Sequence, residues 1–356
     1  MNDMLKKLQQ QLPEGCDAAI IESDVNRRYY TGMQSSAGTL IVTREYSALI
    51  IDFRYYEKAK ATVSGCDVIL QGKLFEQIND ILKRFDIKNV AIESERMTVS
   101  RLEKLKEQFS QCSFVTNGLD KIINRHRMMK SAAELEIMRS AQAVTDKAFA
   151  ELLNFIKIGR TEREVKNELE RLLLHFGGDG LAFETIAVSG KNSSMPHGKP
   201  TDKPLYDGDF LTLDFGAKKN GYCSDMTRTV AVGSVSDEQR RVYDTVLEAQ
   251  QRALAIIKAG VKCSDVDFAA RDFIERESGF SGCFGHGLGH SLGLEIHEEP
   301  RFSPLCDHIT QAGNILSVEP GIYLEGKFGV RIEDVVIIGE NGHENITHAP
   351  KELIIL

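Results

Sequence analysis

The sequence lacks the features that would place the protein in a membrane or on nucleic acid. No apolar run approaches the roughly 20 residues needed to span a bilayer, and the first residues are too polar for a signal peptide. No dense run of lysine and arginine occurs, and the formal net charge of -8 disfavours a nucleic-acid surface. We therefore expect a cytoplasmic protein that binds neither membrane nor nucleic acid.

The seven cysteines are odd in number, are scattered along the chain and never form a C-x-x-C pair. This spacing predicts reduced thiols with mainly structural roles. Cys283 lies near the histidine-rich stretch described below, but no basic neighbour is present to lower its pKa. We therefore do not predict a cysteine nucleophile.

A chain of 356 residues is longer than a single hydrophobic core usually serves, which predicts two domains. In the first part, short β-branched runs alternate with helical patterns, which is typical of a small α/β domain with a mixed or largely parallel sheet. The expected strands cover residues 17–22, 39–43, 47–51, 67–70 and 89–92, and the expected helices cover residues 74–85 and 100–109. Two polar clusters, residues 26–30 and 52–56, are predicted to lie at a surface or interface.

A boundary is indicated where R-H-R-M-M-K, residues 125–130, precedes a helix start. Ser131 and Glu134 have the spacing of a capping box, which predicts that a long helix begins there. We place the two domains at residues 1–126 and 127–356.

The second domain shows the same order of elements twice. Two amphipathic helical patterns precede two β-prone runs, and the same order returns after about residue 236. The second set comprises helices at residues 238–257 and 266–277 and strands at residues 315–318 and 329–338. We expect two structurally similar halves.

Asn220 and Gly221 separate two β-prone runs and form a strong hairpin signal. A two-residue turn at this position places Asp214 opposite Thr227. Side-chain alternation then puts Asp214 and Asp225 on the same face of the hairpin. The two carboxylates are predicted to lie close enough to hold a metal pair.

Three of the nine histidines fall within twelve residues of the stretch F-G-H-G-L-G-H-S-L-G-L-E-I-H-E-E-P, residues 284–300. These histidines are His286, His290 and His297. Glycines surround them, and glycine is used where the backbone adopts unusual dihedrals or approaches another group closely. We expect irregular, rigid backbone here.

Four acidic residues interrupt or close apolar, β-prone runs, where an unpaired carboxylate costs several kcal/mol to bury. They are Asp214, Asp225, Glu319 and Glu333. Together with His290 they form a mostly oxygen donor set, which suits Mn, Co, Fe or Zn. Two divalent ions would balance the four carboxylates and leave a bridging hydroxide as a nucleophile.

These motifs resemble the creatinase and methionine-aminopeptidase family, whose fold is called pita-bread, and within it the Xaa-Pro peptidases of the prolidase and aminopeptidase P branch. The resemblance implies an α/β (α+β) chain, with a small creatinase-like N-terminal domain followed by a pita-bread catalytic domain with pseudo-twofold halves. It implies a metallo-exopeptidase, an Xaa-Pro dipeptidase or aminopeptidase that hydrolyses the bond between an N-terminal residue and proline in short peptides. It also implies a homodimer.

The resemblance also assigns residues. The implied metal ligands are Asp214, Asp225, His290, Glu319 and Glu333. Asp225 and Glu333 would bridge two divalent ions, with Mn expected first and Co, Zn or Fe also compatible. The implied catalytic residues are Glu319 for proton transfer, His297 for the oxyanion, and His197. The expected substrate-binding residues are His197, His286, His297, Arg301 and Arg331.

Arg301 is assigned from its position, four residues beyond His297 on backbone that Pro300 helps to fix. Its planar guanidinium could pair with the free carboxylate of a dipeptide. H-E-E-P does not match a zinc-protease H-E-x-x-H helix, because the second histidine is absent and Pro300 would break the helix.

Two alternatives remain at this point: an exopeptidase like methionine aminopeptidase, which usually lacks the large N-terminal domain, and a non-catalytic binding protein on the same fold. The complete ligand set argues against the second. The sequence leaves open the choice between dipeptidase and aminopeptidase, the residue preferred before proline, the physiological metal and the oligomeric state.

Overall fold

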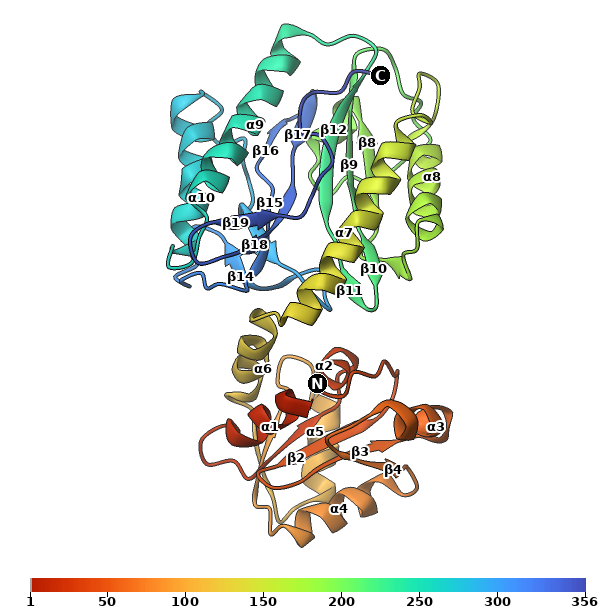
Figure 1. Cartoon of the computed structure of the whole chain (residues 1–356), viewed down its shortest axis with the longest axis vertical. Helices are drawn as coiled ribbons and strands as arrows, with labels where there is room; N and C mark the ends of the chain where they lie inside the picture. The colour runs from red at the N-terminus through yellow and green to blue at the C-terminus, as the bar shows by residue number, and fades with distance from the viewer. Residues whose placement is uncertain (1) are drawn as a thin grey trace. The chain divides into compact units, whose positions relative to one another are not determined.

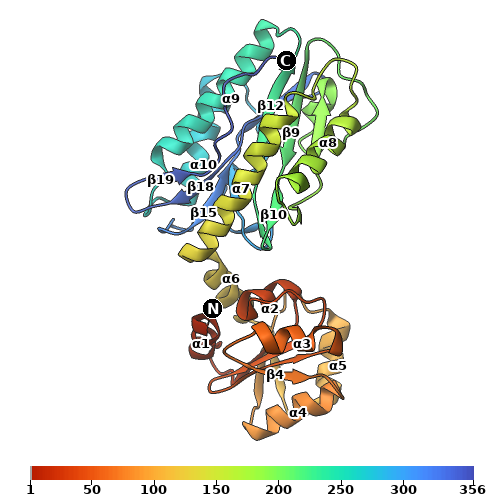
Figure 2. The same cartoon turned by 45° about the vertical axis from the view of Figure 1, so that its right-hand side comes forward.

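The computed structural model describes residues 2–356 and divides into two compact units, Met1–Arg127 and Met128–Leu356. Figures 1 and 2 show each unit with its own strands and its own covering helices. The two-domain α/β architecture predicted from the sequence is confirmed.

The first unit is built on one mixed six-stranded sheet with the order β4-β3-β2-β1-β5-β6. Its strands are β1 Ala18–Ile21, β2 Thr39–Thr43, β3 Ser47–Ile51, β4 Asp67–Leu70, β5 Asn89–Ile92 and β6 Ser113–Val115. Its helices are α1 Asn2–Gln10, α2 Asp24–Thr31, α3 Phe53–Thr62, α4 Leu74–Arg84, α5 Val99–Gln108 and α6 Leu119–Met128. The five strands expected from β-branched content are all present.

Both faces of this sheet are buried. Along β1, Ala19 and Ile21 belong to one apolar core, whereas Ala18 and Ile20 belong to the core on the other face. Successive side chains of a strand point to opposite faces, so a strand covered on both sides is apolar throughout. This explains why the buried strands β1, β2 and β3 are nearly continuous apolar runs.

The prediction that residues 26–30 lie at a surface was wrong. They fall in α2, where Asn26, Arg27 and Tyr30 are only 3%, 1% and 1% exposed. The Asn26 amide donates to the buried Glu93 carboxylate at 2.7 Å. A short polar cluster can therefore be core when residues distant in sequence supply its hydrogen-bond partners.

The second unit contains four long helices and thirteen short strands among the described residues. The helices are α7 Ala132–Leu152, α8 Glu162–His175, α9 Asp237–Ile256 and α10 Cys263–Asp272, with a 3-10 turn η1 Gly190–Ser194 and a π-helical turn η2 Phe273–Glu277. The strands of the first half are β7 Gly180–Leu181, β8 Ile186–Ser189, β9 Asp209–Phe215, β10 Ala217–Lys219, β11 Tyr222–Cys223 and β12 Met226–Val232. Those of the second half are β13 Gly289–Ser291, β14 Glu298–Phe302, β15 Ile315–Val318, β16 Gly321–Leu324, β17 Phe328–Arg331, β18 Asp334–Ile338 and β19 His343–Asn345.

The second unit consists of two halves with the predicted order of helix, helix, strands. In the first half, α7 and α8 lie beside the β12-β9-β8 sheet, and in the second, α9 and α10 lie beside the β14-β13-β15-β18-β19 sheet (Figures 1 and 2). Each half has a hydrophobic core of its own. The pita-bread catalytic domain with similar halves is thereby confirmed.

The predicted start of the long helix is confirmed. Ser131 and Glu134 form a reciprocal capping box at the start of α7, and the structure shows a second box, formed by Thr161 and Glu164, at the start of α8. In both, the cap side chain accepts from the backbone N–H three residues on, and the glutamate accepts from the cap's own N–H.

One predicted strand was wrong. Residues 329–338 were expected as a single strand, but they form β17 and β18, which belong to different sheets. The break falls at Ile332 and Glu333, where the Glu333 N–H bonds to the Thr227 carbonyl of the first half at 3.0 Å. This crossing between halves turns the chain and aims Glu333 into the interior.

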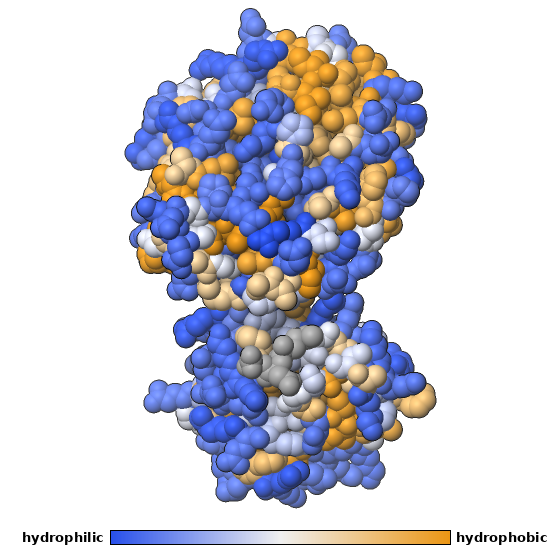
Figure 3. Space-filling model, in the orientation of Figure 1, coloured by the Kyte–Doolittle hydropathy of each residue, from blue (hydrophilic) through white to orange (hydrophobic). Residues whose placement is uncertain are grey.

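Polar side chains cover much of the visible face of each unit in Figure 3, with apolar side chains gathered in smaller patches. Among the described helices, none is both long and apolar enough to cross a membrane. The seven cysteines are all free thiols.

Candidate metal centre and substrate cavity

The first pair of acids is placed by a tight hairpin. Asn220 and Gly221 both have positive φ, 47° and 82°, as a two-residue turn of type I′ requires. The pairing of β9 with β12 sets Asp214 opposite Thr227, as predicted. Asp225 directly precedes β12, so both acids come from the same end of this strand pair.

The second pair of acids has a matching setting. Strands β15 and β18 pair antiparallel, with Val318 opposite Asp334. Glu319 directly follows β15, and Glu333 directly precedes β18. Each half therefore contributes two carboxylates from the end of one antiparallel strand pair.

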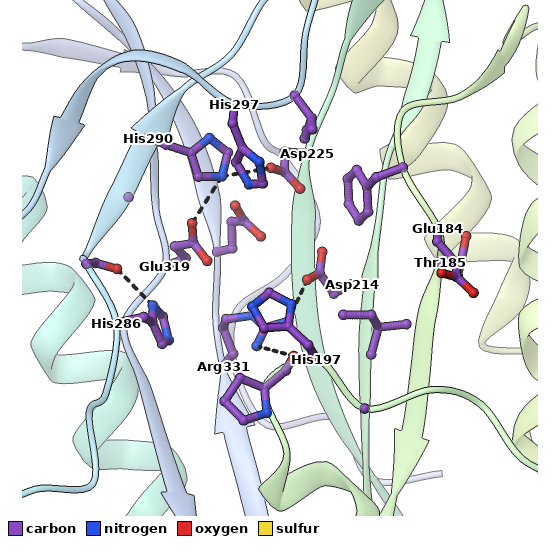
Figure 4. Close-up of a pocket in the computed structure, with 18 of the residues that line it drawn as sticks. Glu184, Thr185, His197, Asp214, Asp225, His286, His290, His297, Glu319 and Arg331 are labelled. Carbon is purple, nitrogen blue, oxygen red and sulfur yellow. Dashed lines mark hydrogen bonds and ion pairs between the residues drawn. The ribbon is translucent and has the colours of Figure 1, made fainter.

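His290 on β13 completes the cluster. Ligand atoms of Asp225, His290 and Glu333 all lie within 4.8 Å of one another. The Nε2 atom of His290 is 3.3 Å from Glu319 Oε1 and 3.6 Å from Asp225 Oδ2 (Figure 4).

The tautomer of His290 follows from its other ring nitrogen. Nδ1 lies 3.1 Å from the Ser291 carbonyl oxygen, which can only accept, so Nδ1 carries the proton. Burial, followed by the charge of His297, lowers the pKa of His290 to about 3. The neutral ring keeps the Nε2 lone pair facing the carboxylates, the arrangement of a metal-ligating histidine.

The protein alone does not supply a hydrogen-bond partner for every carboxylate oxygen of this cluster. Asp214 Oδ1 and Glu333 Oε1 are buried and have no hydrogen-bond partner. Burial and then the charge of neighbouring acids raise the pKa values of Asp225 and Glu333. Burial likewise raises the pKa of Glu319. Oxygen and imidazole donors that converge with unused lone pairs fit a divalent cation, so the residues present suit the metal that the sequence predicted.

Arg331 is the buried cation beside the cluster. Its guanidinium donates to Asp214 Oδ2 and to the Tyr323 hydroxyl, the latter at 2.8 Å. It also donates to the Pro196 carbonyl at 3.3 Å and to Thr227 Oγ1 at 3.1 Å. Arg331 thus connects the Asp214 carboxylate of the first half with the chain segment before His197.

Tyr323 was missed from the sequence. Its hydroxyl bonds both Arg331 and His286 Nε2, the latter at 2.9 Å. His286 Nδ1 lies 2.8 Å from the Gly287 carbonyl, so both ring nitrogens are engaged within the protein. The only signal for Tyr323 was a phenol in the otherwise apolar run G-I-Y-L.

One cavity of about 670 Å³ brings all ten predicted site residues together. They are His197, Asp214, Asp225, His286, His290, His297, Arg301, Glu319, Arg331 and Glu333. The His297 ring lies edge-on to the His290 ring, with centroids 4.5 Å apart. Arg301 is 53% exposed and has Glu299 3.5 Å away, so its guanidinium is accessible from the cavity.

The opposite wall was also missed from the sequence. It is formed by residues 183–186 and by Lys199, and Figure 4 shows Glu184 and Thr185 across the cavity from His286. Glu184 and Lys199 form an exposed ion pair at 3.4 Å. These residues carry no motif, and residues 183–186 reach the site because they lead into β8, whose pairing with β9 sets Ile186 opposite Asp214.

Residues 136–340 match metallopeptidase family M24, and residues 4–129 match the creatinase/prolidase N-terminal domain. The Xaa-Pro dipeptidase of Pyrococcus furiosus is 37% identical over 356 residues, covering 99% of this chain and 100% of that protein.

Two solved structures share the fold over nearly the whole chain. The Xaa-Pro dipeptidase from Bacillus anthracis has a TM-score of 0.95 at 37% identity, covering 100% of this chain and 99% of that chain. The X-Pro aminopeptidase from Thermotoga maritima has a TM-score of 0.91 at 38% identity, covering 96% of this chain and 98% of that chain.

Proposed function

Because the chain belongs to metallopeptidase family M24, we propose that it hydrolyses the bond between an N-terminal residue and proline in short peptides, with divalent metal as cofactor. The observation that carries the proposal is the convergence of four carboxylates and His290, with two buried carboxylate oxygens left unpartnered, in a peptide-sized cavity. The similar dipeptidase and aminopeptidase support the preference for proline.

Five side chains hold the metal in this proposal: Asp214, Asp225, His290, Glu319 and Glu333. Asp225 and Glu333 come from opposite halves, so both halves would hold the metal, and Mn is the first candidate. Divalent ions bound there would act as Lewis acids and lower the pKa of water.

The remaining roles belong to the protein's own groups. Glu319 moves a proton to the leaving proline nitrogen, which must be protonated to depart. His297 projects into the cavity beside His290, where it donates a hydrogen bond to the developing oxyanion. His197 contacts the substrate from the other side of the cavity.

His286 and Arg331 support the site rather than bind peptide in this proposal. Each is held by Tyr323, and Arg331 also bonds Asp214. Arg301 is accessible and binds the free carboxylate of a dipeptide, which favours Xaa-Pro dipeptides over longer peptides.

We further propose that the enzyme is a cytoplasmic homodimer with a domain boundary between residues 126 and 127. The scattered free cysteines suit a reducing compartment. Gel filtration with light scattering tests the dimer.

A peptide panel tests the proposed function. The purified chain, with its metal content measured, should hydrolyse Ala-Pro and not Ala-Ala or Met-Ala-Ser, and the Asp225→Asn variant should be inactive. Preference for Met-Ala-Ser would indicate an activity like that of methionine aminopeptidase. No hydrolysis of any peptide by a fully metallated sample would indicate a binding protein and overturn the proposal.

A further inference from the structure

Among the described residues, one acid outside the cluster of candidate ligands is buried beside the cavity wall and accepts hydrogen bonds from neutral groups. Glu162, the first residue of α8, is 0% exposed. Its carboxylate accepts six hydrogen bonds, from Ser189, Asn192 and Thr201. No sequence pattern indicates this arrangement, because Glu162 has the position of an ordinary acidic residue in the first turn of a helix.

The bonds to Glu162 come from both ends of one loop. Oε1 accepts from the Ser189 N–H at 2.7 Å and from its hydroxyl at 3.0 Å. Oε2 accepts from the Thr201 N–H at 2.9 Å and from its hydroxyl at 2.7 Å. The Asn192 amide bridges both oxygens, at 3.1 and 3.3 Å. One carboxylate therefore joins the start and the end of residues 189–201, which we call the His197 loop.

The His197 loop is fixed at its far side as well. The Ser193 hydroxyl accepts from the Gly329 N–H at 2.9 Å, and the Pro196 carbonyl accepts from Arg331. A side chain at residue 329 would lie only 2.2 Å from the Ser193 carbonyl oxygen, so the contact is close. His197 itself is exposed in the cavity, and its position depends on the loop that carries it.

Helix capping alone does not explain this burial. Glu164, in the same turn of α8, already completes the capping box from an exposed position. Burying a second carboxylate costs several kcal/mol unless hydrogen bonds offset it. Two backbone N–H groups and three side chains of the loop supply that offset, so the buried charge and the closed loop depend on each other.

We propose that Glu162 is a positioning residue that clamps the two ends of the His197 loop and thereby holds His197 at the substrate. This inference rests on the proposed peptidase function for its kinetic consequence, but the clamp itself has a readout that needs no activity. Glu162 touches neither the metal cluster nor the cavity.

Hydrogen exchange tests the clamp directly. Glu162→Gln replaces one acceptor oxygen by an amide NH₂ that cannot accept, so one end of the loop loses its bonds. The amides of Ser189 and Thr201 should then exchange at least about tenfold faster, because exchange reports local opening. Glu164→Gln, a change in the same helix turn that leaves the loop bonds intact, is the matched control. Unchanged exchange in Glu162→Gln would overturn the clamp whether or not the protein is a peptidase.

A double-mutant cycle tests the action through His197. In the active enzyme, Glu162→Gln should lower kcat/KM for Ala-Pro on the order of 10- to 100-fold, as expected for a misplaced catalytic-site group, with metal content unchanged. In a His197→Ala background the same change should have little further effect. An equal loss in both backgrounds would show that Glu162 does not act through His197.

A milder variant covers the case in which Glu162→Gln fails to fold. Thr201→Val keeps the shape of the side chain but removes the hydroxyl bond to Oε2. It should raise exchange at Thr201 and lower kcat/KM in the wild-type background, and again much less in the His197→Ala background. Wild-type exchange and kcat/KM in Thr201→Val would count against the clamp.

Discussion

Lys130 and Glu298 form a buried ion pair, with Nζ and Oε2 3.0 Å apart and side chains 1% and 5% exposed. Lys130 also donates to Ser291 Oγ at 3.2 Å. Glu298 directly follows His297, and Ser291 directly follows His290, so one lysine holds the backbone beside both histidines. Gly293 leaves room for this pair, because a Cβ at that residue would lie 2.8 Å from the Glu298 carboxylate.

Breaking this pair from one side should be costly. Lys130→Met removes the positive charge beside the buried Glu298 carboxylate and should destabilise the second unit by about 3–5 kcal/mol in denaturant unfolding. The double variant Lys130→Met, Glu298→Gln should recover most of that loss. Lys73→Met, which removes a solvent-exposed pair with Glu76, is the control and should leave the melting temperature unchanged. A single variant as stable as the wild type would contradict this account of the pair.

Chelation should lower thermal stability as well as remove activity. Without metal the clustered carboxylates repel one another, and metal binds only the folded site. Metal at about 100 times its Kd contributes roughly 2.7 kcal/mol. Differential scanning calorimetry with and without chelator, followed by metal addition, measures the effect. If the melting temperature of a sample shown to contain metal does not change with chelator, that result would count against the buried cluster.

The two neighbouring histidines should respond differently to removal. His290→Ala should lose bound metal, because Nε2 faces Asp225 and Glu319. His297→Ala should keep the metal and lose on the order of a hundredfold or more in turnover, the scale of an oxyanion donor. Metal stoichiometry and kcat, measured on both variants, show which histidine binds metal. Loss of metal in His297→Ala but not in His290→Ala would exchange the two roles.

Arg301 should select dipeptides. Arg301→Ala should weaken Ala-Pro hydrolysis by roughly 1.5–3 kcal/mol, the scale of a hydrogen bond to a charged group. Ala-Pro-Ala should be affected far less, since its carboxylate lies one residue further on. Lys199→Ala, a change on the opposite wall of the cavity, is the matched control. Equal losses on both substrates would remove Arg301 as the selector.

His126 should make stability fall in mild acid. Burial, followed by the charges of Lys7 and Arg125, lowers its pKa to about 4 from an ordinary value near 6.5. Its Nε2 pairs with Gln11 at 2.8 Å and its Nδ1 with the Tyr30 hydroxyl at 3.0 Å, which the neutral ring satisfies.

The sign of the effect follows from linkage. Between pH 6.5 and about 4 the unfolded imidazole holds a proton that the folded one does not, so acid favours unfolding. Melting temperatures of the wild type and of His126→Gln, measured from pH 7 to 4, should diverge, with the wild type falling more steeply relative to its value at pH 7. Parallel curves would show that His126 does not titrate in this way.

Local signals made the helix starts and the central hairpin predictable. Capping boxes act within four residues, and Asn220-Gly221 sets a register that extends to Asp214 and Thr227 without further information. The candidate site could be predicted because burying an unpaired carboxylate costs free energy. Acids in apolar runs, together with clustered histidines, therefore indicate a chemical function.

Features that depend on distant partners were not readable. The burial of Asn26 requires the Glu93 carboxylate, and the break before Glu333 requires the Thr227 carbonyl. Glu162 likewise looks like a helix-start acid until the loop from Ser189 to Thr201 folds over it. A sequence pattern indicates how much free energy the burial of a residue costs. It does not show which hydrogen-bond partners offset that cost, because the tertiary fold brings those partners together.

The division of the candidate ligands between halves also orders the events of biosynthesis. Asp214 and Asp225 leave the ribosome first, and the other three predicted ligands follow up to Glu333, more than a hundred residues later. Until the second half has folded against the first, the early pair has neither His290 nor the opposing glutamates to complete a metal sphere. We therefore expect metal uptake to follow the folding of the second half, so that an unfinished chain binds no metal and cleaves no peptide.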